Sequence, residues 1–481
     1  MITFITSILI LIAGYFIYGK YVEKKFGADD SIPTPVKTMA DGVDYVELPL
    51  WRIFMIQLLN IAGLGPIFGA ILGAKYGESA YIWIVFGCIF MGATHDYISG
   101  MMSIRQGGAS ISEIIGKYLG NSFKGLSRIV TLLLVIIVGA AFVNGPASLL
   151  TTLTDGLLSF PMWVGIIMLY YILATLLPID TVIGRIYPFF GAVLLIMAFG
   201  IGGYMIFSGM PMTEISSDVF HNYQLDTSKN IMFPMIFIVI SCGAISGFHS
   251  TQSPLMARCL KKESQAKKAF FGAMIAEGIL ALIWATAAIN YFGGPEQLNQ
   301  MMAMPNHNPA WLVNEVCNSW LGHYGAILAI IGVVACPITS GDTAYRSARL
   351  LLSDIFKIDQ KSLLKRLLVA LPVFILGFGL SQIEFTAIWK YLGILNQSLA
   401  VIVLWTGSAY FAYHRKNHWF ITLPATFLTF IVAMYFVVAP NAQGGLFLSV
   451  STGYAVGTIA AVAAIIAFLQ YAKKLPNKSI Q

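Results

Sequence analysis

Imidazole and carboxylate groups occur in this chain inside apolar segments, where a charge is costly. His249 follows a glycine-rich interruption, Glu277 lies near the centre of a long apolar segment, and His95 and Asp96 lie towards one end of another. An ionised carboxylate at membrane depth needs a partner or a proton, and imidazole changes its charge near neutral pH. These residues are candidates for carrying a coupled proton. The alternative for each is a hydrogen bond that only ties helices together.

Glycine and proline interrupt two apolar segments near their centres, and hydroxyl groups surround the second interruption. The candidates for substrate binding at these interruptions are Gly63, Gly65, Pro66, Gly243, Ser246, Gly247, His249 and Ser250. A broken helix survives at membrane depth only where protein or a wet cavity satisfies the freed backbone groups. The half-helix that restarts there directs N–H groups and a positive dipole end at an anion. A matched pair of breaks points to the binding site of a transporter, although close helix packing also uses small residues.

A third polar stretch runs from Cys336 to Arg349. Thr339, Ser340 and Thr343 supply hydroxyls that, with backbone carbonyls of the first break, would coordinate sodium. The candidates for the coupling ion or proton are Thr339, Ser340, Asp342, Thr343, Glu277, Asp96 and His95. Asp342 either acts in transport or forms an i,i+4 ion pair with Arg346, and we expect Arg346 and Arg349 to be structural. Weaker candidates are Lys390, Asn396 and Gln397.

The elements that position these residues are membrane helices. The chain has 481 residues, 57% hydrophobic and 11% charged, whereas soluble proteins have about 25% charged residues. Long apolar stretches predict about thirteen spans. They cover residues 2–19, 51–74, 79–104, 123–144, 161–178, 186–208, 233–256, 268–292, 322–346, 364–380, 386–413, 418–438 and 447–471. We expect the first to be a retained helix, and a signal peptide is the alternative. Residues 20–50 are expected to form an inner loop, and residues 293–321 an outer loop able to fold over a vestibule.

The distribution of Lys and Arg orients the spans. With the N-terminus outside and the C-terminus in the cytoplasm, all of the 29 Lys and Arg residues except Lys75, Lys229 and Lys390 fall on the inner side. The net charge of +7 therefore reflects membrane topology, and no basic soluble face is present for nucleic acid. The five cysteines show no disulfide or zinc pattern. No GxxxxGK[ST] motif occurs, which disfavours ATP-driven transport. We expect no cofactor.

The two interrupted spans are the second and the seventh, and they cross the membrane in opposite directions. Residues 51–208 and 233–413 would then be two five-helix repeats of inverted topology within one membrane domain. Residues 1–50 supply a peripheral helix and an inner loop, and residues 418–471 supply two peripheral helices. The expected fold is all-α, polytopic and LeuT-like, with discontinuous second and seventh helices.

Four phrases of this sequence resemble the carbon starvation protein A (CstA) family. They are Asp41-Gly-Val-Asp-Tyr45, Ile61-Ala-Gly-Leu-Gly-Pro-Ile-Phe-Gly-Ala70, Ser241-Cys-Gly-Ala-Ile-Ser-Gly-Phe-His249 and Asp342-Thr-Ala-Tyr-Arg-Ser-Ala-Arg349. The resemblance runs from residue 1 to at least residue 350. It implies a bacterial inner-membrane uptake system of the amino acid-polyamine-organocation superfamily, for peptides or for pyruvate, with proton coupling in the pyruvate case. The chain is shorter than the long members of the family, so residues of their C-terminal part cannot be carried over.

These observations predict a secondary active symporter for a small carboxylate-bearing solute. The solute's carboxylate would meet the half-helix N-termini near Gly65 and Gly247, and the coupling ion would be H⁺ or Na⁺. A peptide would also need a buried acid for its ammonium group, such as Glu277 or Asp96, whereas pyruvate would need a small cavity without one. The alternatives are an intramembrane enzyme using Asp96 and Asp342, and a starvation sensor that transports nothing.

Overall fold

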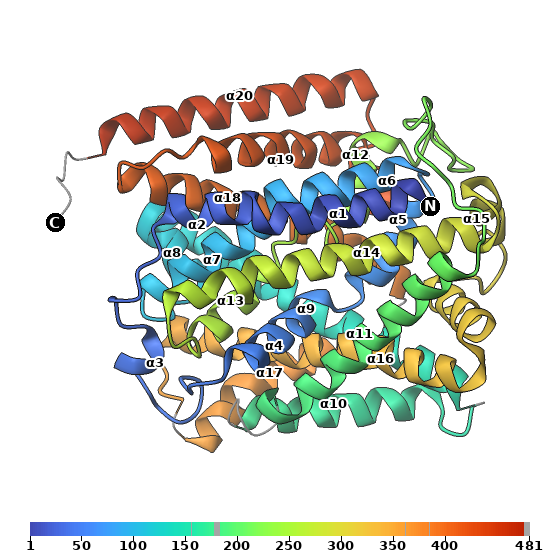
Figure 1. Cartoon of the computed structure of the whole chain (residues 1–481). Helices are drawn as coiled ribbons and strands as arrows, with labels where there is room; N and C mark the ends of the chain where they lie inside the picture. Colours follow the sequence, from blue (N-terminus) through green and yellow to red (C-terminus); the bar gives the residue numbers. More distant parts are fainter. Residues whose placement is uncertain (155, 178–182, 361, 384, 476–481) are drawn as a thin grey trace.

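The computed structural model describes residues 1–154, 156–177, 183–360, 362–383 and 385–475. The side chain of Lys390, one of the weaker candidates, lies outside the described residues. All regular elements in these ranges are helices. Ten of them are long and apolar enough to cross a membrane, or eleven when a bent helix pair in the second span is counted. Figure 1 shows most of the helices lying side by side in one bundle, with α18, α19 and α20 stacked along one flank.

Each predicted span coincides with one helix or with consecutive helices. In chain order these are α1 (Ile2–Phe16); α4 (Leu50–Ala62), η1 (Gly65–Gly69) and α5 (Ala70–Ala74); α6 (Ser79–Ile82), η2 (Trp83–Gly92) and α7 (Ala93–Arg105); α9 (Asn121–Leu153); α10 (Phe160–Leu176); α11 (Ile183–Phe207); α12 (Met232–Val239) and α13 (His249–Ala257); η4 (Lys267–Phe271) and α14 (Gly272–Tyr291); α16 (Pro309–Phe356); α17 (Leu363–Ser381); α18 (Phe385–Tyr413); α19 (Trp419–Val438); and α20 (Val450–Lys474). The remaining elements are α2 (Tyr18–Phe26), α3 (Pro35–Thr38), α8 (Ile111–Leu119), η3 (Glu263–Gln265), α15 (Pro295–Met301) and η5 (Asn441–Gln443).

Two loop predictions are wrong in part. Residues 20–50 contain most of α2 and all of α3, and residues 293–321 contain α15 and the first turns of α16. Asn308 caps α16, because its side-chain oxygen accepts a hydrogen bond from the Trp311 N–H at 2.9 Å, and Pro309 takes the first helical position. Gly322 interrupts α16 with φ 66° and ψ 178°. The apolar span therefore begins at that interruption, while the polar turns before it are already helical.

The second span is broken where glycine and proline predicted a break. Helix α4 ends at Ala62, Gly63 has φ 51°, and the following half bends away by 54°. A left-handed φ favours glycine, because a Cβ would clash with the backbone. Gly65 has a different constraint, since a Cβ there would lie 2.0 Å from the Cβ of Cys242. The first break is therefore packed directly against the second.

The seventh span is broken between Val239, where α12 ends, and His249, where α13 begins. The intervening residues 240–248 form turns rather than a continuous helix. A Cβ at Gly69 would lie 3.0 Å from the carbonyl oxygen of Val239, so the second half of the second span lies against the end of α12, where the seventh span breaks. The expectation of discontinuous second and seventh helices is confirmed.

Candidate functional site

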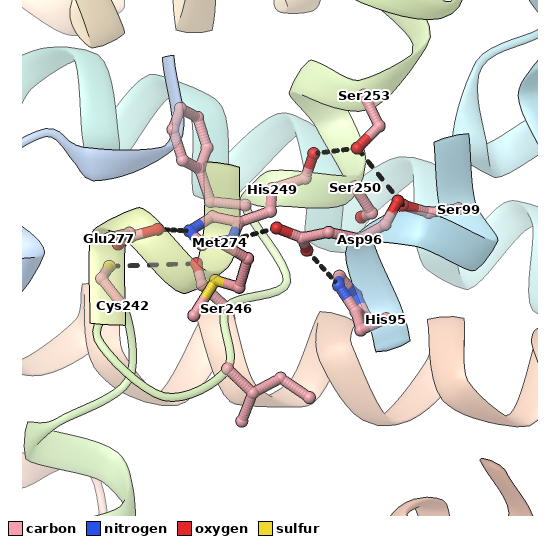
Figure 2. A network of polar contacts seen from close by, with 12 residues as sticks. His95, Asp96, Ser99, Cys242, Ser246, His249, Ser250, Ser253, Met274 and Glu277 are labelled. Carbon is pink, nitrogen blue, oxygen red and sulfur yellow. Dashed lines mark hydrogen bonds and ion pairs between the residues drawn. The ribbon is translucent and has the colours of Figure 1, made fainter. Parts of the chain in front are cut away.

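His249, at the start of α13, lies between two carboxylates from different helices (Figure 2). Its Nδ1 is 2.9 Å from Oδ2 of Asp96 on α7, and its Nε2 is 3.5 Å from Oε2 of Glu277 on α14. All three side chains are fully buried. The structure therefore joins three of the predicted candidates, from the third, seventh and eighth spans, into one chain of ionisable groups.

The two carboxylates differ in how well the protein satisfies them. Asp96 also contacts Nδ1 of His95 through Oδ1 at 2.8 Å, so both of its oxygens have imidazole partners. Glu277 makes no hydrogen bond within the described part of the chain. An ionised carboxylate in such surroundings is costly, and a proton or a charged imidazole removes the cost. Glu277 is thus the member of the chain with the greatest need for a proton.

Serine hydroxyls hold the backbone beside His249. Ser253 Oγ donates to the carbonyl of His249 at 3.1 Å, and Ser99 Oγ on α7 donates to Ser253 Oγ at 3.3 Å (Figure 2). Ser250 Oγ donates to the carbonyl of Gly247 at 2.6 Å. The bond between Ser99 and Ser253 ties α13 to α7 by a second route, in addition to the contact between His249 and Asp96.

Asn396 on α18 supports the second break. Its Oδ1 accepts the N–H of Phe248 at 2.7 Å and the hydroxyl of Ser246 at 2.9 Å, while its backbone carbonyl accepts the N–H of Gly247 at 3.1 Å. A Cβ at Gly247 would lie 2.3 Å from that carbonyl oxygen, so only glycine allows this approach. At the second break, the N–H groups of Gly247 and Phe248, which were predicted to meet a carboxylate, are bonded to Asn396 in this conformation.

The remaining candidates of the two breaks have packing contacts. Pro66 takes an early position of η1, and the N–H groups of Ile67 and Phe68 bond to the carbonyl of Leu64 at 3.3 and 2.7 Å. Gly243 lies against Ala281 of α14, where a Cβ would come within 2.5 Å of the alanine Cβ. The predicted carboxylate position between Gly65 and Gly247 stays a prediction.

The predicted sodium ligands lie beside the first break, on α16. Ser340 Oγ donates to the carbonyl of Leu59 in α4 at 2.5 Å, and Thr339 Oγ1 donates to the carbonyl of Cys336 at 2.8 Å. Thr343 Oγ1 bonds to the carbonyls of Thr339 and Ser340 at 3.2 and 3.1 Å. All three hydroxyls thus bond to backbone carbonyls. The Ser340 hydroxyl is the one of the three that joins α16 directly to α4.

Asp342 forms no ion pair with Arg346, so that alternative for Asp342 is wrong. Its Oδ2 accepts hydrogen bonds from the phenol of Tyr187 on α11 and, at 3.3 Å, from that of Tyr170 on α10. Neither tyrosine was a candidate, because nothing in the sequence distinguishes them from other membrane tyrosines. Asp342 therefore joins three helices at a place separate from the His249 chain.

Arg346 and Arg349 instead bind Asp44, in the loop before α4. Arg346 Nη1 lies 3.0 Å from Oδ1 of Asp44, and Arg349 Nη2 lies 3.6 Å from Oδ2. Burial raises the pKa of Asp44, but the two guanidinium groups outweigh burial and hold the pKa below its ordinary value. Sequence analysis missed Asp44 as a partner, although it lies in the phrase Asp41-Gly-Val-Asp-Tyr45. The ion cluster ties the loop before α4 to α16.

A cavity of about 470 Å³ lies at the opposite end of the two broken spans. Lys75, which follows α5, and Ser241, in the second break, both line it. Asn308 and Pro309, at the start of α16, also line it, so part of the predicted outer loop contributes to its wall. The cavity therefore leads from the end of the bundle to the second break.

Comparisons with known proteins agree with this architecture. A family model described as "Carbon starvation protein CstA" matches residues 1–162 and 151–322. An "Uncharacterized membrane protein" of Haemophilus influenzae is 41% identical over 351 residues, which is 63% of this chain and 94% of the relative. "Peptide transporter CstA" of Bacillus subtilis is 26% identical over 504 residues, covering 84% of each chain. "Pyruvate/proton symporter BtsT" of Escherichia coli is 24% identical over 346 residues, 59% of this chain and 48% of the relative.

Among solved structures, the crystal structure of MhsT in complex with L-phenylalanine superposes with a TM-score of 0.54. The superposition covers 88% of this chain and 98% of that chain at 13% identity, so it shows the shared LeuT-like fold alone. The relatives with a named activity are membrane transporters, which excludes the intramembrane enzyme. The match of the family model to two thirds of the chain and the Haemophilus relative lead to one assignment: the chain belongs to the carbon starvation protein CstA family.

Proposed function

We propose that this chain is a proton-coupled symporter that takes up a small carboxylate-bearing solute across the bacterial inner membrane by alternating access. The observation that carries the proposal is His249, which starts the half-helix after the second break and contacts Asp96 and Glu277 at once. A group at this position senses a proton and the conformation of the break together.

Protonation changes what holds α13 to its neighbours. A charged His249 forms attractive pairs with Asp96 and Glu277, whereas a neutral imidazole can donate only one hydrogen bond from a single ring nitrogen. Removing the proton therefore weakens at least one of the ties from α13 to α7 and α14. We propose that the proton enters this chain from the outer side and leaves it on the inner side after the two broken spans have moved.

The site of the solute follows from the backbone groups of the second break. We place the carboxylate against the Phe248 N–H and the Ser246 hydroxyl, both of which now bond to Oδ1 of Asn396. An amide oxygen and a carboxylate oxygen accept from the same donors, and a carboxylate accepts more strongly. Binding would thus exchange one acceptor for another and free Asn396 to move with α18.

Proton coupling is preferred to sodium coupling on the geometry of α16. The predicted sodium site needs the backbone carbonyls of the first break and the hydroxyl oxygens of α16 to face a cation. Ser340 instead donates its hydroxyl hydrogen to the Leu59 carbonyl. The hydroxyl of α16 and the carbonyl of α4 therefore bond to each other and do not face a cation together. The proton coupling named for the Escherichia coli relative supports the same choice.

The proposed orientation has the N-terminus outside and the C-terminus in the cytoplasm. The cavity beside Lys75 then opens outwards, and the Asp44 cluster closes the cytoplasmic end. We also propose that residues 51–208 and 233–413 are the two inverted repeats within one membrane domain, with the rest peripheral. This division accounts for a broken helix at the start of each repeat.

Uptake into proteoliposomes tests the proposed function. Purified protein is reconstituted, and accumulation of labelled pyruvate and of labelled dialanine is measured under an imposed pH gradient, an imposed sodium gradient, or neither. We expect the pH gradient alone to drive accumulation of at least one of the two solutes. Accumulation driven by the sodium gradient and not by the pH gradient would refute proton coupling. Absence of gradient-driven uptake of both solutes would refute the symporter.

A further inference from the structure

The cavity lined by Lys75 and Ser241, called the outer cavity below, has an uneven distribution of charge. Among the described residues that line it, Lys75 is the only charged one. Aromatic and amide groups supply most of the remaining polar lining, including Trp389, Tyr435 and Gln443. The walls are therefore suited to an anion and offer no carboxylate to a cation.

The ammonium group of Lys75 has no ion-pair partner within the described part of the chain. Burial lowers its pKa, because a partly desolvated ammonium group is disfavoured. Its backbone is fixed, since Nδ2 of the buried Asn299 on α15 donates to the Lys75 carbonyl at 2.7 Å. By contrast Lys229, another predicted outer cation, is exposed and pairs with Asp226 at 3.0 Å. Lys75 thus holds a positive charge in the cavity that a bound anion would neutralise.

The cavity connects this charge to the second break. Lys75 follows the last helical half of the second span, and Ser241 lies in the break of the seventh. Ser241 Oγ is within 3.4 Å of Nδ2 of Asn396, the residue that holds the Phe248 N–H. The cavity that holds Lys75 thus reaches Ser241, which contacts Asn396 beside the proposed solute site.

We propose that the outer cavity is a first binding site for a small monocarboxylate, in which the Lys75 ammonium pairs with the carboxylate before the solute reaches the second break. Since the described lining has no acid, the site prefers an anion without an ammonium group, such as pyruvate, to a zwitterionic dipeptide. The direction of movement rests on the proposed function, whereas binding at Lys75 does not.

Chemical labelling tests binding independently of transport. Trinitrobenzenesulfonate, an anionic reagent specific for neutral amines, is applied to the purified protein, and mass spectrometry measures modification at Lys75 and Lys229. We expect pyruvate to slow modification of Lys75 at least fivefold and to leave Lys229 unchanged, while dialanine at equal concentration protects neither. Modification of Lys75 at the same rate with and without pyruvate would overturn the proposal. Equal protection by dialanine would overturn the preference for an anion.

Kinetics provide the second readout. We expect Lys75→Met to raise the KM for pyruvate uptake about tenfold with little change in the maximal rate, and Lys75→Arg to retain most of the affinity. Lys229→Met is the matched control, because it removes a paired cation outside the cavity, and its KM should equal that of the unmodified protein. An unchanged KM in Lys75→Met refutes the access role while the proposed function stands. If the unmodified protein takes up no pyruvate, the proposed function fails for pyruvate, and the labelling result still decides whether Lys75 binds it.

Discussion

Replacing Asp44 by asparagine should destabilise the protein far more than a similar change nearby. Asp44 is buried and is the carboxylate that contacts both Arg346 and Arg349. Removing its charge leaves two buried guanidinium groups uncompensated, and breaking a buried ion pair in this way costs about 3–5 kcal/mol. Arg346 keeps its bonds to the carbonyls of Ala174 and Leu177, at 2.6 and 2.8 Å, which places the expected cost at the lower end of that range.

Glu47→Gln is the matched control. Glu47 lies in the same loop and pairs with Lys261 at 3.0 Å, but both side chains are about half exposed. An exposed pair of this kind contributes about 0–1 kcal/mol. Thermal unfolding of the detergent-solubilised protein at pH 7 should show a clear drop in midpoint for Asp44→Asn and almost none for Glu47→Gln. Equal midpoints for the two variants would refute the stabilising role of the ion cluster.

The difference in unfolding midpoint between the unmodified protein and Asp44→Asn should depend on pH in a defined direction. Burial raises the pKa of Asp44, but the arginines lower it by more, so the net pKa lies below the ordinary 3.8. A group whose pKa is depressed by folding contributes stability that is complete above its unfolded pKa and is lost as the pH falls through its folded pKa. The gap in unfolding midpoint between the unmodified protein and Asp44→Asn should therefore be constant from pH 7 to pH 5 and shrink below about pH 3.8. A gap that shrinks between pH 7 and pH 5 would contradict the assignment.

Two further substitutions test the breaks. Gly65→Ala should abolish uptake, because the added Cβ would lie 2.0 Å from the Cβ of Cys242. The additional change Cys242→Gly should restore uptake. Gly165→Ala is the control, because an added Cβ at Gly165 meets open space. Asn396→Leu leaves the buried Phe248 N–H unpaired, which costs about 1–3 kcal/mol, and should lower the unfolding midpoint, whereas Asn318→Leu at an exposed position should not. Gly65→Ala with normal uptake, or equal midpoints for the two asparagine variants, would contradict the packing described.

The sequence predicted the features that local chemistry determines. Glycine and proline inside apolar segments located both breaks. At the first break, Gly63 combines φ 51° with ψ −137°, a conformation that side chains disfavour, and a Cβ at Gly65 would clash with Cys242. His249 and Glu277 were recognised as candidates because titratable groups are costly at membrane depth. That His249 meets Asp96 and Glu277 together depends on the register of three packed helices, which apolar periodicity does not specify.

Local spacing also misled in one place. Asp342 and Arg346 are at i,i+4 and so favoured each other, but Arg346 pairs with Asp44, 302 positions away in the sequence, and Asp342 bonds to Tyr170 and Tyr187. A loop aspartate and two membrane tyrosines carry no sequence signal for these partners. Asn396 was only a weak candidate. An amide in an apolar helix indicates that the side chain has a polar partner, but the sequence does not identify that partner.

The most direct test of the central claim is proton-driven accumulation in His249→Gln, compared with exchange of preloaded solute in the same vesicles. Exchange requires binding and the movement of the loaded carrier, while accumulation also requires the proton to be coupled. We predict that His249→Gln retains exchange and loses accumulation under a pH gradient. His221→Gln, at an exposed position in the loop before α12, should retain both. Accumulation by His249→Gln at the level of the unmodified protein would show that the imidazole between Asp96 and Glu277 does not couple protons to transport.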